Sequence, residues 1–203
     1  MTVGVVDYEA GNLKSVETAL RALDARITIS ASPEALLKTD RLIFPGVGDA
    51  AAATAVLRAR GLDEAIHAFV ATGRPVLGIC LGSQIVLDAS EENEATCLGL
   101  IGGAARRFSG DLGLKVPHMG WNQIVPTGDH PFFAGIPSGA SFYFVHSYYP
   151  SPDDPATVLA RTDYGIRFAS AIGRDNLTAV QFHPEKSGPH GLRMLQNFLD
   201  YRG

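Results

Sequence analysis

Cys80 lies between two glycines in the segment Gly78-Ile79-Cys80-Leu81-Gly82, directly after an apolar run. This spacing at a junction of strand and helix is typical of a nucleophile elbow, where a sharp turn holds the nucleophile in a strained conformation. A helix beginning at Leu81 would direct its free N–H groups at the sulfur, favour the thiolate and offer one oxyanion donor. The alternative is a small buried cysteine without a chemical role.

His183 and Glu185 follow the apolar segment 177–182 and form a second candidate site. Histidine is the most frequent general base in enzymes, and a nearby carboxylate can hold its ring and stabilise the imidazolium. A lone His-Pro-Glu triplet is most often a surface turn. Together with Cys80 it predicts a thiol, a base and an acid that meet in space, because such groups need not be close in sequence.

The segment Pro45-Gly46-Val47-Gly48 follows a third apolar run and has little side-chain bulk. Backbone N–H groups of Val47 and Gly48 could face a developing oxyanion there. The loop lacks the Lys and Ser or Thr of a phosphate-binding P-loop, so we do not read it as a nucleotide site. An ordinary tight turn between a strand and a helix is the alternative.

The elements that must position these groups alternate along the first half of the chain. The pattern predicts strands at 2–8, 26–30, 41–45 and 75–79, and helices at 13–23, 49–60, 62–73 and 82–89. Strands alternating with helices indicate parallel βαβ units with right-handed crossovers. The strand at 75–79 is continuously apolar, which predicts burial on both faces.

The second half favours strands separated by Gly, Pro and Asp turns, followed by one last helix. The expected strands lie within 115–126, 141–150, 157–173 and 177–185, and the helix spans 189–201. We therefore predict one α/β domain, residues 1–203, with a mainly parallel sheet flanked by helices and extended by antiparallel strands. Such sheets bind ligands beyond the carboxyl ends of their strands, where all three candidate segments fall.

Composition excludes several classes of function. The chain has 203 residues, a net charge of -4 and 46% hydrophobic residues, which does not fit a binder of nucleic acids or anionic membranes. Its two cysteines form no disulfide framework, and no His or Cys pair has metal-ligand spacing. The opening residues lack the features of a secretory leader. We expect a soluble, cytoplasmic protein without a metal or organic cofactor.

Three motifs in this order, PGVG, GICLGSQ and FHPEKS, resemble class I glutamine amidotransferases. The resemblance covers essentially the whole chain and implies the flavodoxin-like fold of that class. Within the class, the segments VVDYEAGNL, PHMGWN, YFVHSYY and HPEKS resemble the glutaminase subunits of imidazole glycerol phosphate synthases. These enzymes serve histidine biosynthesis.

The resemblance implies a role for each matching residue. Cys80 would attack the side-chain amide of glutamine, His183 would move protons, and Glu185 would orient His183. The oxyanion would be held by Leu81 and by Val47 or Gly48. Glutamine would be bound at Gly46, Gln84, His146, Ser147 and Tyr148.

The resemblance also implies a partner, a (β/α)8 cyclase subunit that receives ammonia and forms a heterodimer with this chain. Positions matching the partner contact are Asn12, Trp121, Tyr143 and Lys186. Two residues depart from the family pattern. Glu9 stands near the expected partner contact where glycine is common, and Ser83 stands where methionine is frequent.

Other readings remain open at this level. A glutaminase that serves anthranilate or pyridoxal phosphate synthesis would share the triad, although PGVG, MGWN and HPEKS argue against it. A cysteine peptidase or amidase on a similar scaffold would act on other amides. A scaffold with an inert Cys80 would have no activity.

Overall fold

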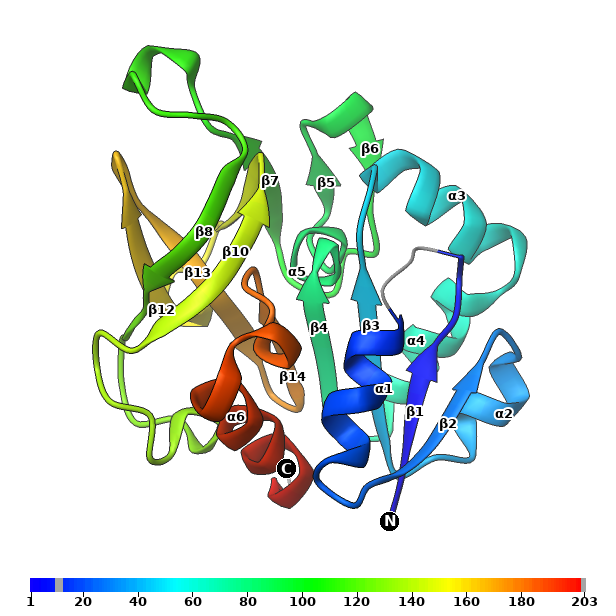
Figure 1. Ribbon diagram of the computed structural model, residues 1–203. Coiled ribbons are helices and arrows are strands. Elements are labelled where there is room, and N and C mark those ends of the chain that lie inside the picture. Colours follow the sequence, from blue (N-terminus) through cyan, green and yellow to red (C-terminus); the bar gives the residue numbers. More distant parts are fainter. Residues whose placement is uncertain (10–12, 202–203) are drawn as a thin grey trace.

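The computed structural model describes residues 1–9 and 13–201. Its centre is an eight-stranded sheet with the order β2-β1-β3-β4-β14-β13-β12-β9 (Figure 1). The strands are β1 (Thr2–Val6), β2 (Arg26–Ser30), β3 (Arg41–Gly46), β4 (Val76–Cys80), β9 (Val125–Pro126), β12 (Val158–Tyr164), β13 (Ile166–Arg174) and β14 (Leu177–Val180). Strands β2, β1, β3, β4 and β14 pair with their neighbours in parallel. Strands β13, β12 and β9 extend the sheet by antiparallel pairing. The predicted fold class is thus confirmed.

Two smaller sheets stand beside the carboxyl ends of the parallel strands. One pairs β8 (His118–Gln123) with β10 (Ser141–His146), and the other has the order β11-β7-β5-β6. Its strands are β5 (Ala89–Ser90), β6 (Ala95–Thr96), β7 (Gly103–Arg107) and β11 (Tyr148–Pro152). The chain leaves β10 at His146 and enters β11 at Tyr148, so Ser147 passes from one sheet to the other.

Helices cover both faces of the large sheet, as its apolar strands require. Val16 and Leu20 of α1 and Met194 of α6 pack on one face, and Leu57 and Phe69 belong to the cluster on the other. Figure 1 shows α1 and α6 in front of the sheet. The helices are α1 (Leu13–Arg21), α2 (Pro33–Leu37), α3 (Ala50–Ala59), α4 (Leu62–Ala71), α5 (Leu81–Ile85) and α6 (Gly188–Asp200). Short 3-10 turns include η1 (Glu92–Glu94), η2 (Gly110–Leu112), η3 (Pro131–Phe133), η4 (Pro155–Thr157) and η5 (Pro184–Lys186).

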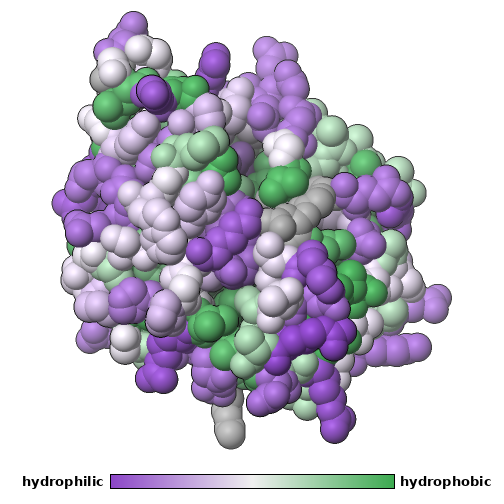
Figure 2. Space-filling model, in the orientation of Figure 1, coloured by the Kyte–Doolittle hydropathy of each residue, from purple (hydrophilic) through white to green (hydrophobic). Residues whose placement is uncertain are grey.

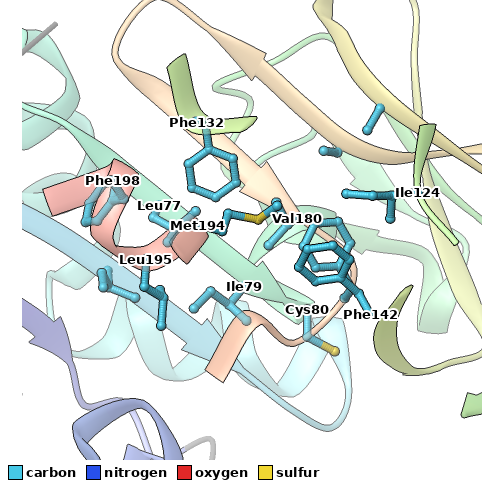
Figure 3. Packing of buried hydrophobic residues seen from close by; sticks show 14 of the residues in the cluster. Leu77, Ile79, Cys80, Ile124, Phe132, Phe142, Val180, Met194, Leu195 and Phe198 are labelled. Carbon is cyan, nitrogen blue, oxygen red and sulfur yellow. The ribbon is translucent and has the colours of Figure 1, made fainter. Parts of the chain in front are cut away.

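Strand β4 is buried along its whole length, which confirms the prediction made from its continuous apolar run. Leu77 and Ile79 join the cluster under α1 and α6, whereas Val76 joins the cluster on the other face. Cys80, the last residue of β4, belongs to the first cluster, and Figure 3 shows it among other side chains of that cluster. The nucleophile candidate is therefore anchored by a strand that has packed neighbours on both faces.

Two glycines allow α5 to approach the sheet closely enough to form the turn at Cys80. A Cβ at Gly82 would lie 2.4 Å from the carbonyl oxygen of Phe44, and a Cβ at Gly78 would lie 3.0 Å from the backbone of Gly82. Any side chain at either position would push the helix away from β3 and β4. The spacing Gly-x-Cys-x-Gly thus reflects two backbone contacts.

Several predicted boundaries are wrong in instructive ways. The helix expected at 82–89 ends at Ile85, because Ala89 and Ser90 form β5 and pair with β6 and β7. The strand expected to end at Pro45 extends to Gly46, which pairs with Cys80 of β4. Helix α2 and strands β5, β6 and β7 were not predicted, because each is short and lacks a clear apolar period.

The surface offers no broad apolar area on the side seen in Figure 1. Figure 2 shows hydrophilic and hydrophobic residues mixed over this face. Within residues 1–9 and 13–201, no helix has the length and apolar character needed to cross a membrane.

Candidate active site

Cys80 adopts the strained conformation expected of an elbow, with φ 55° and ψ -107°. Positive φ is unfavourable for a residue with a side chain and is tolerated only when the surroundings impose it. The side chain is buried, with weak sulfur contacts to the carbonyl oxygen of Val145 at 3.9 Å and to Nε2 of Gln181 at 3.8 Å. Because α5 begins at Leu81, its first N–H groups lie next to the sulfur.

His183 and Glu185 form a buried pair near Cys80. Nδ1 of His183 lies 2.7 Å from Oε1 of Glu185, and both side chains are 2% exposed. Burial lowers the pKa of His183, but Cys80 and Glu185 together outweigh it and raise the pKa above its usual value. Nε2 of His183 is buried without a well-aligned hydrogen bond to the described residues, although Cys80 lies near enough to raise the pKa of the ring. The ring is thus held through Nδ1, and Nε2 is left to exchange protons with a reacting group.

A cavity of about 360 Å³ opens beside Cys80 and is large enough for an amino acid. It brings together most of the residues predicted to bind glutamine or hold the oxyanion: Val47, Gly48, Leu81, Gln84, His146, Ser147 and Tyr148. Gly46 is not in its lining and packs behind the loop against Tyr8. A larger hollow of about 730 Å³ runs along residues 126–138, and none of the predicted catalytic or glutamine-binding residues lines it.

Gln84 is fixed by two hydrogen bonds of its side-chain amide. Nε2 donates to the carbonyl oxygen of Tyr148 at 3.1 Å and to Oε1 of Gln181 at 3.0 Å. Since both amide hydrogens are used, Oε1 of Gln84 is the atom left to meet a ligand. Gln181 also contacts Cys80, so its buried side chain connects the turn at Cys80 to Gln84 in the cavity wall. Sequence reasoning missed Gln181, although it begins the segment QFHPEKS.

Glu92 also lines the cavity and was not predicted. Its Oε2 accepts a hydrogen bond from the N–H of Ala50, at the start of α3, at 2.9 Å. Burial raises the pKa of Glu92 and Asp49 adds to the rise, while the bond from Ala50 opposes it. Glu92 lies in a short polar turn with no periodic pattern, so only the fold reveals it. A partly buried carboxylate in this position suits a ligand that carries an ammonium group.

His118 and His146 connect strand β8 to the cavity through a directed chain of hydrogen bonds. Nδ1 of His146 lies 2.7 Å from the carbonyl oxygen of Tyr148 and must donate to it. Nε2 of His146 therefore accepts from Nδ1 of His118 at 2.9 Å, and Nε2 of His118 accepts from Asn122 at 3.2 Å. Burial is the main cause that lowers the pKa of His118 to about 4 and of His146 to about 3. Both rings are neutral at pH 7.

The two departures from the family pattern both have a structural account. Glu9 has φ 67°, a conformation that glycine adopts freely, and its carboxylate forms an ion pair with Arg60. Ser83 is fully buried and is not part of the cavity lining. Its hydroxyl donates to the carbonyl oxygen of Cys80 at 2.8 Å, so it supports the elbow turn.

Three of the residues predicted at the partner contact gather on one face. Trp121 of β8 is 60% exposed and pairs in register with Tyr143 of β10, with ring centroids 6.3 Å apart. Nζ of Lys186 lies 5.9 Å from the Tyr143 ring. Asn12 lies outside the described residues. In the part of the chain that the structure describes, no three His, Cys, Asp or Glu side chains gather to hold a metal ion.

Comparison with known proteins tests the resemblance. Residues 4–201 match the profile of the family described as glutamine amidotransferase class-I. The chain belongs to the class I glutamine amidotransferases. This amidotransferase is 49% identical over 97% of its length to "Imidazole glycerol phosphate synthase subunit HisH" of Dehalococcoides mccartyi, covering 96% of that protein. It is 48% identical to the protein of the same name in Nitrosococcus oceani, with 100% and 98% of the two chains covered.

Solved structures agree with the amidotransferase fold. "Structure of PurLQS from Thermotoga maritima" includes a chain that matches with a TM-score of 0.78 at 19% identity, with 98% of each chain covered. "Crystal structure of glutamine amidotransferase" matches with a TM-score of 0.73 at 21% identity, with 98% and 97% covered. At this level of identity the likeness concerns the fold alone.

The neutral histidine pair predicts a specific dependence of stability on pH. A histidine in the unfolded chain has a pKa near 6.5, so lowering it to about 4 in the fold stabilises the protein above pH 6.5. That contribution is lost as the pH falls from 6.5 to 4. Between pH 7 and pH 5, we expect the free energy of unfolding to fall by about 2 kcal/mol less in His118→Phe than in the wild type.

Urea unfolding of wild-type and variant proteins at both pH values measures this difference. His67 is exposed on α4, so His67→Gln serves as the control and should keep the wild-type dependence. Equal losses in His118→Phe and the wild type would contradict a neutral, buried His118.

Proposed function

We propose that the chain is the glutaminase subunit of imidazole glycerol phosphate synthase and acts in histidine biosynthesis. The observation that carries the proposal is a strained, buried Cys80 that lines a cavity the size of an amino acid, next to a buried His183–Glu185 pair. The high identity to synthase subunits over nearly the full chain supports the choice within the family.

In the first half of the reaction, the thiolate of Cys80 attacks the side-chain amide carbon of glutamine. The negative charge that develops on the amide oxygen is held by the N–H of Leu81 and by that of Val47 or Gly48, which line the same cavity. Protonated His183 gives its Nε2 proton to the leaving nitrogen, and the C–N bond breaks. Ammonia and a glutamyl thioester on Cys80 result.

In the second half, neutral His183 takes a proton from water, which attacks the thioester carbon. The C–S bond breaks, glutamate leaves, and the thiolate is restored beside a protonated His183. Glu185 stabilises the imidazolium in both halves, because its carboxylate contacts Nδ1. The raised pKa of His183 fits this cycle, since the ring must carry a proton when glutamine arrives.

Substrate binding follows from the polar groups in the cavity wall. The α-ammonium group of glutamine would pair with the carboxylate of Glu92, and Oε1 of Gln84 would accept a second hydrogen bond. The backbone from His146 to Tyr148 lines the same cavity, and the neutral histidine pair fixes its carbonyl at Tyr148. Cys97 is not among the residues that line this cavity, and burial raises the pKa of its thiol to about 11.

The partner would be the (β/α)8 cyclase subunit, which combines the ammonia with a phosphoribosyl-linked intermediate. It would yield imidazole glycerol phosphate and an aminoimidazole carboxamide ribotide. The face formed by Trp121, Tyr143 and Lys186 suits this contact, since it offers two aromatic rings and a cation next to the turn that carries Glu185. The pair would work in the cytoplasm.

A peptidase or general amidase is less well supported, because a cavity that carries an acid for an ammonium group favours a free amino acid over a peptide. A glutaminase for anthranilate or pyridoxal phosphate synthesis would use the same site. The identity of 49% and 48% to synthase subunits argues against it.

Cys80→Ala, in the complex with the cyclase, tests whether Cys80 is needed to release ammonia from glutamine but not to use ammonia in synthesis. Glutamine-dependent product formation should fall by at least about 10³-fold, because no other group can form the thioester. Synthesis from ammonium salts should continue, since the cyclase needs only ammonia. Cys97→Ala is the matched control and should keep both activities. Loss of both activities in Cys80→Ala, or neither, would contradict the proposal.

Glu92→Gln tests the recognition of the ammonium group. The variant keeps the size of the side chain but removes its charge, so the KM for glutamine should rise about tenfold with kcat little changed. Glu94→Gln removes an exposed charge from the same short turn and should leave the KM as in the wild type. Steady-state glutamate release by the complex measures both constants, and an unchanged KM in Glu92→Gln would rule out this contact.

A further inference from the structure

Among the residues that the structure describes, the hydroxyl of Tyr8 is buried and has no hydrogen-bond partner. Tyr8 follows strand β1, and the residue is only 2% exposed. Buried phenols nearly always pair their O–H with an acceptor, because an unpaired polar group loses its hydration without compensation. A hydroxyl kept in such a place is expected to gain a partner in another state of the site.

Tyr8 lies directly behind the loop that is proposed to hold the oxyanion. A methyl group at Gly46 would collide with the Tyr8 hydroxyl and would lie 3.0 Å from Cβ of Leu81. Gly46 is also the register partner of Cys80 between β3 and β4. Burial raises the pKa of Tyr8 far above its usual value, and the charge of Cys80 adds to the rise, so the hydroxyl lies within electrostatic reach of the sulfur.

The peptide that joins Gly46 to Val47 can supply the missing acceptor. The C=O and N–H of one peptide point in opposite directions, because the unit is planar and trans. When the N–H of Val47 turns into the cavity, the carbonyl oxygen of Gly46 turns away from it. Tyr8 is absent from the cavity lining and occupies the space behind Gly46.

We propose that Tyr8 is a positioning residue of the oxyanion hole. Its hydroxyl donates to the carbonyl oxygen of Gly46 when the Val47 N–H faces the reacting carbonyl, and so stabilises that orientation of the peptide. The inference rests on the proposed glutaminase function and adds a residue to its machinery. Tyr8 is not among the residues that line the cavity, so it would act through Gly46 and not on the substrate itself.

Tyr8→Phe in the complex with the cyclase tests the proposal, because it removes only the hydroxyl. The kcat for glutamine hydrolysis should fall about fivefold, which is the order of magnitude of one neutral hydrogen bond, with little change in KM. Binding of glutamate γ-semialdehyde should weaken by a similar factor, because this aldehyde forms an oxyanion-bearing adduct with the thiol. The melting temperature should stay the same or rise.

Tyr201→Phe removes a phenol at the end of α6, far along the chain from the loop, and is the control for both kinetic measurements. An unchanged kcat and aldehyde affinity in Tyr8→Phe would overturn the proposal, as would a change in KM alone. A fall in kcat that accompanies a melting temperature lower by several degrees would assign Tyr8 to packing and also overturn it. If the wild-type complex does not hydrolyse glutamine, the proposed function fails instead.

Discussion

The close contact between α5 and β3 is the constraint on which the rest of the site depends. Gly82 lies against the carbonyl of Phe44, and this contact forces the chain to turn within one residue at the end of β4. Cys80 must then take a positive φ, and its sulfur is held over the cavity. The strain is sustained because β4 is buried on both faces and pairs with β3 and β14. The same turn places the Leu81 N–H and Gln84 on adjoining walls.

Two kinds of histidine show how the surroundings set the chemistry. His183 and His146 are both buried, and burial alone lowers the pKa of each. His183 faces a thiol and a carboxylate, which favour the charged ring. His146 faces a second neutral histidine and a carbonyl group, so its charged form gains little. The ring of His183 is thus suited to proton transfer, whereas the ring of His146 is suited to holding the cavity wall at Tyr148 in place.

The sequence predicted the alternation of strands and helices in the first half and placed Cys80, His183 and the PGVG loop after strands, because apolar period and strand-end position are local signals. It could not predict that Glu92 lines the cavity, since this depends on how a short polar turn packs against the start of α3. Gln181 was missed for the same reason, because its importance comes from its contacts with Gln84 and Cys80 across the fold. Boundaries failed where short strands such as β5 are stabilised only by pairing with distant segments.

Covalent labelling tests most directly the claim that Cys80 is the activated nucleophile of a glutamine site. The complex is treated with 6-diazo-5-oxo-L-norleucine, a reactive glutamine analogue, and its peptides are analysed by mass spectrometry. We expect a single adduct, on the peptide that contains Cys80, and protection from labelling by excess glutamine. An adduct on Cys97, or no adduct on Cys80 under conditions where glutamine is hydrolysed, would contradict it.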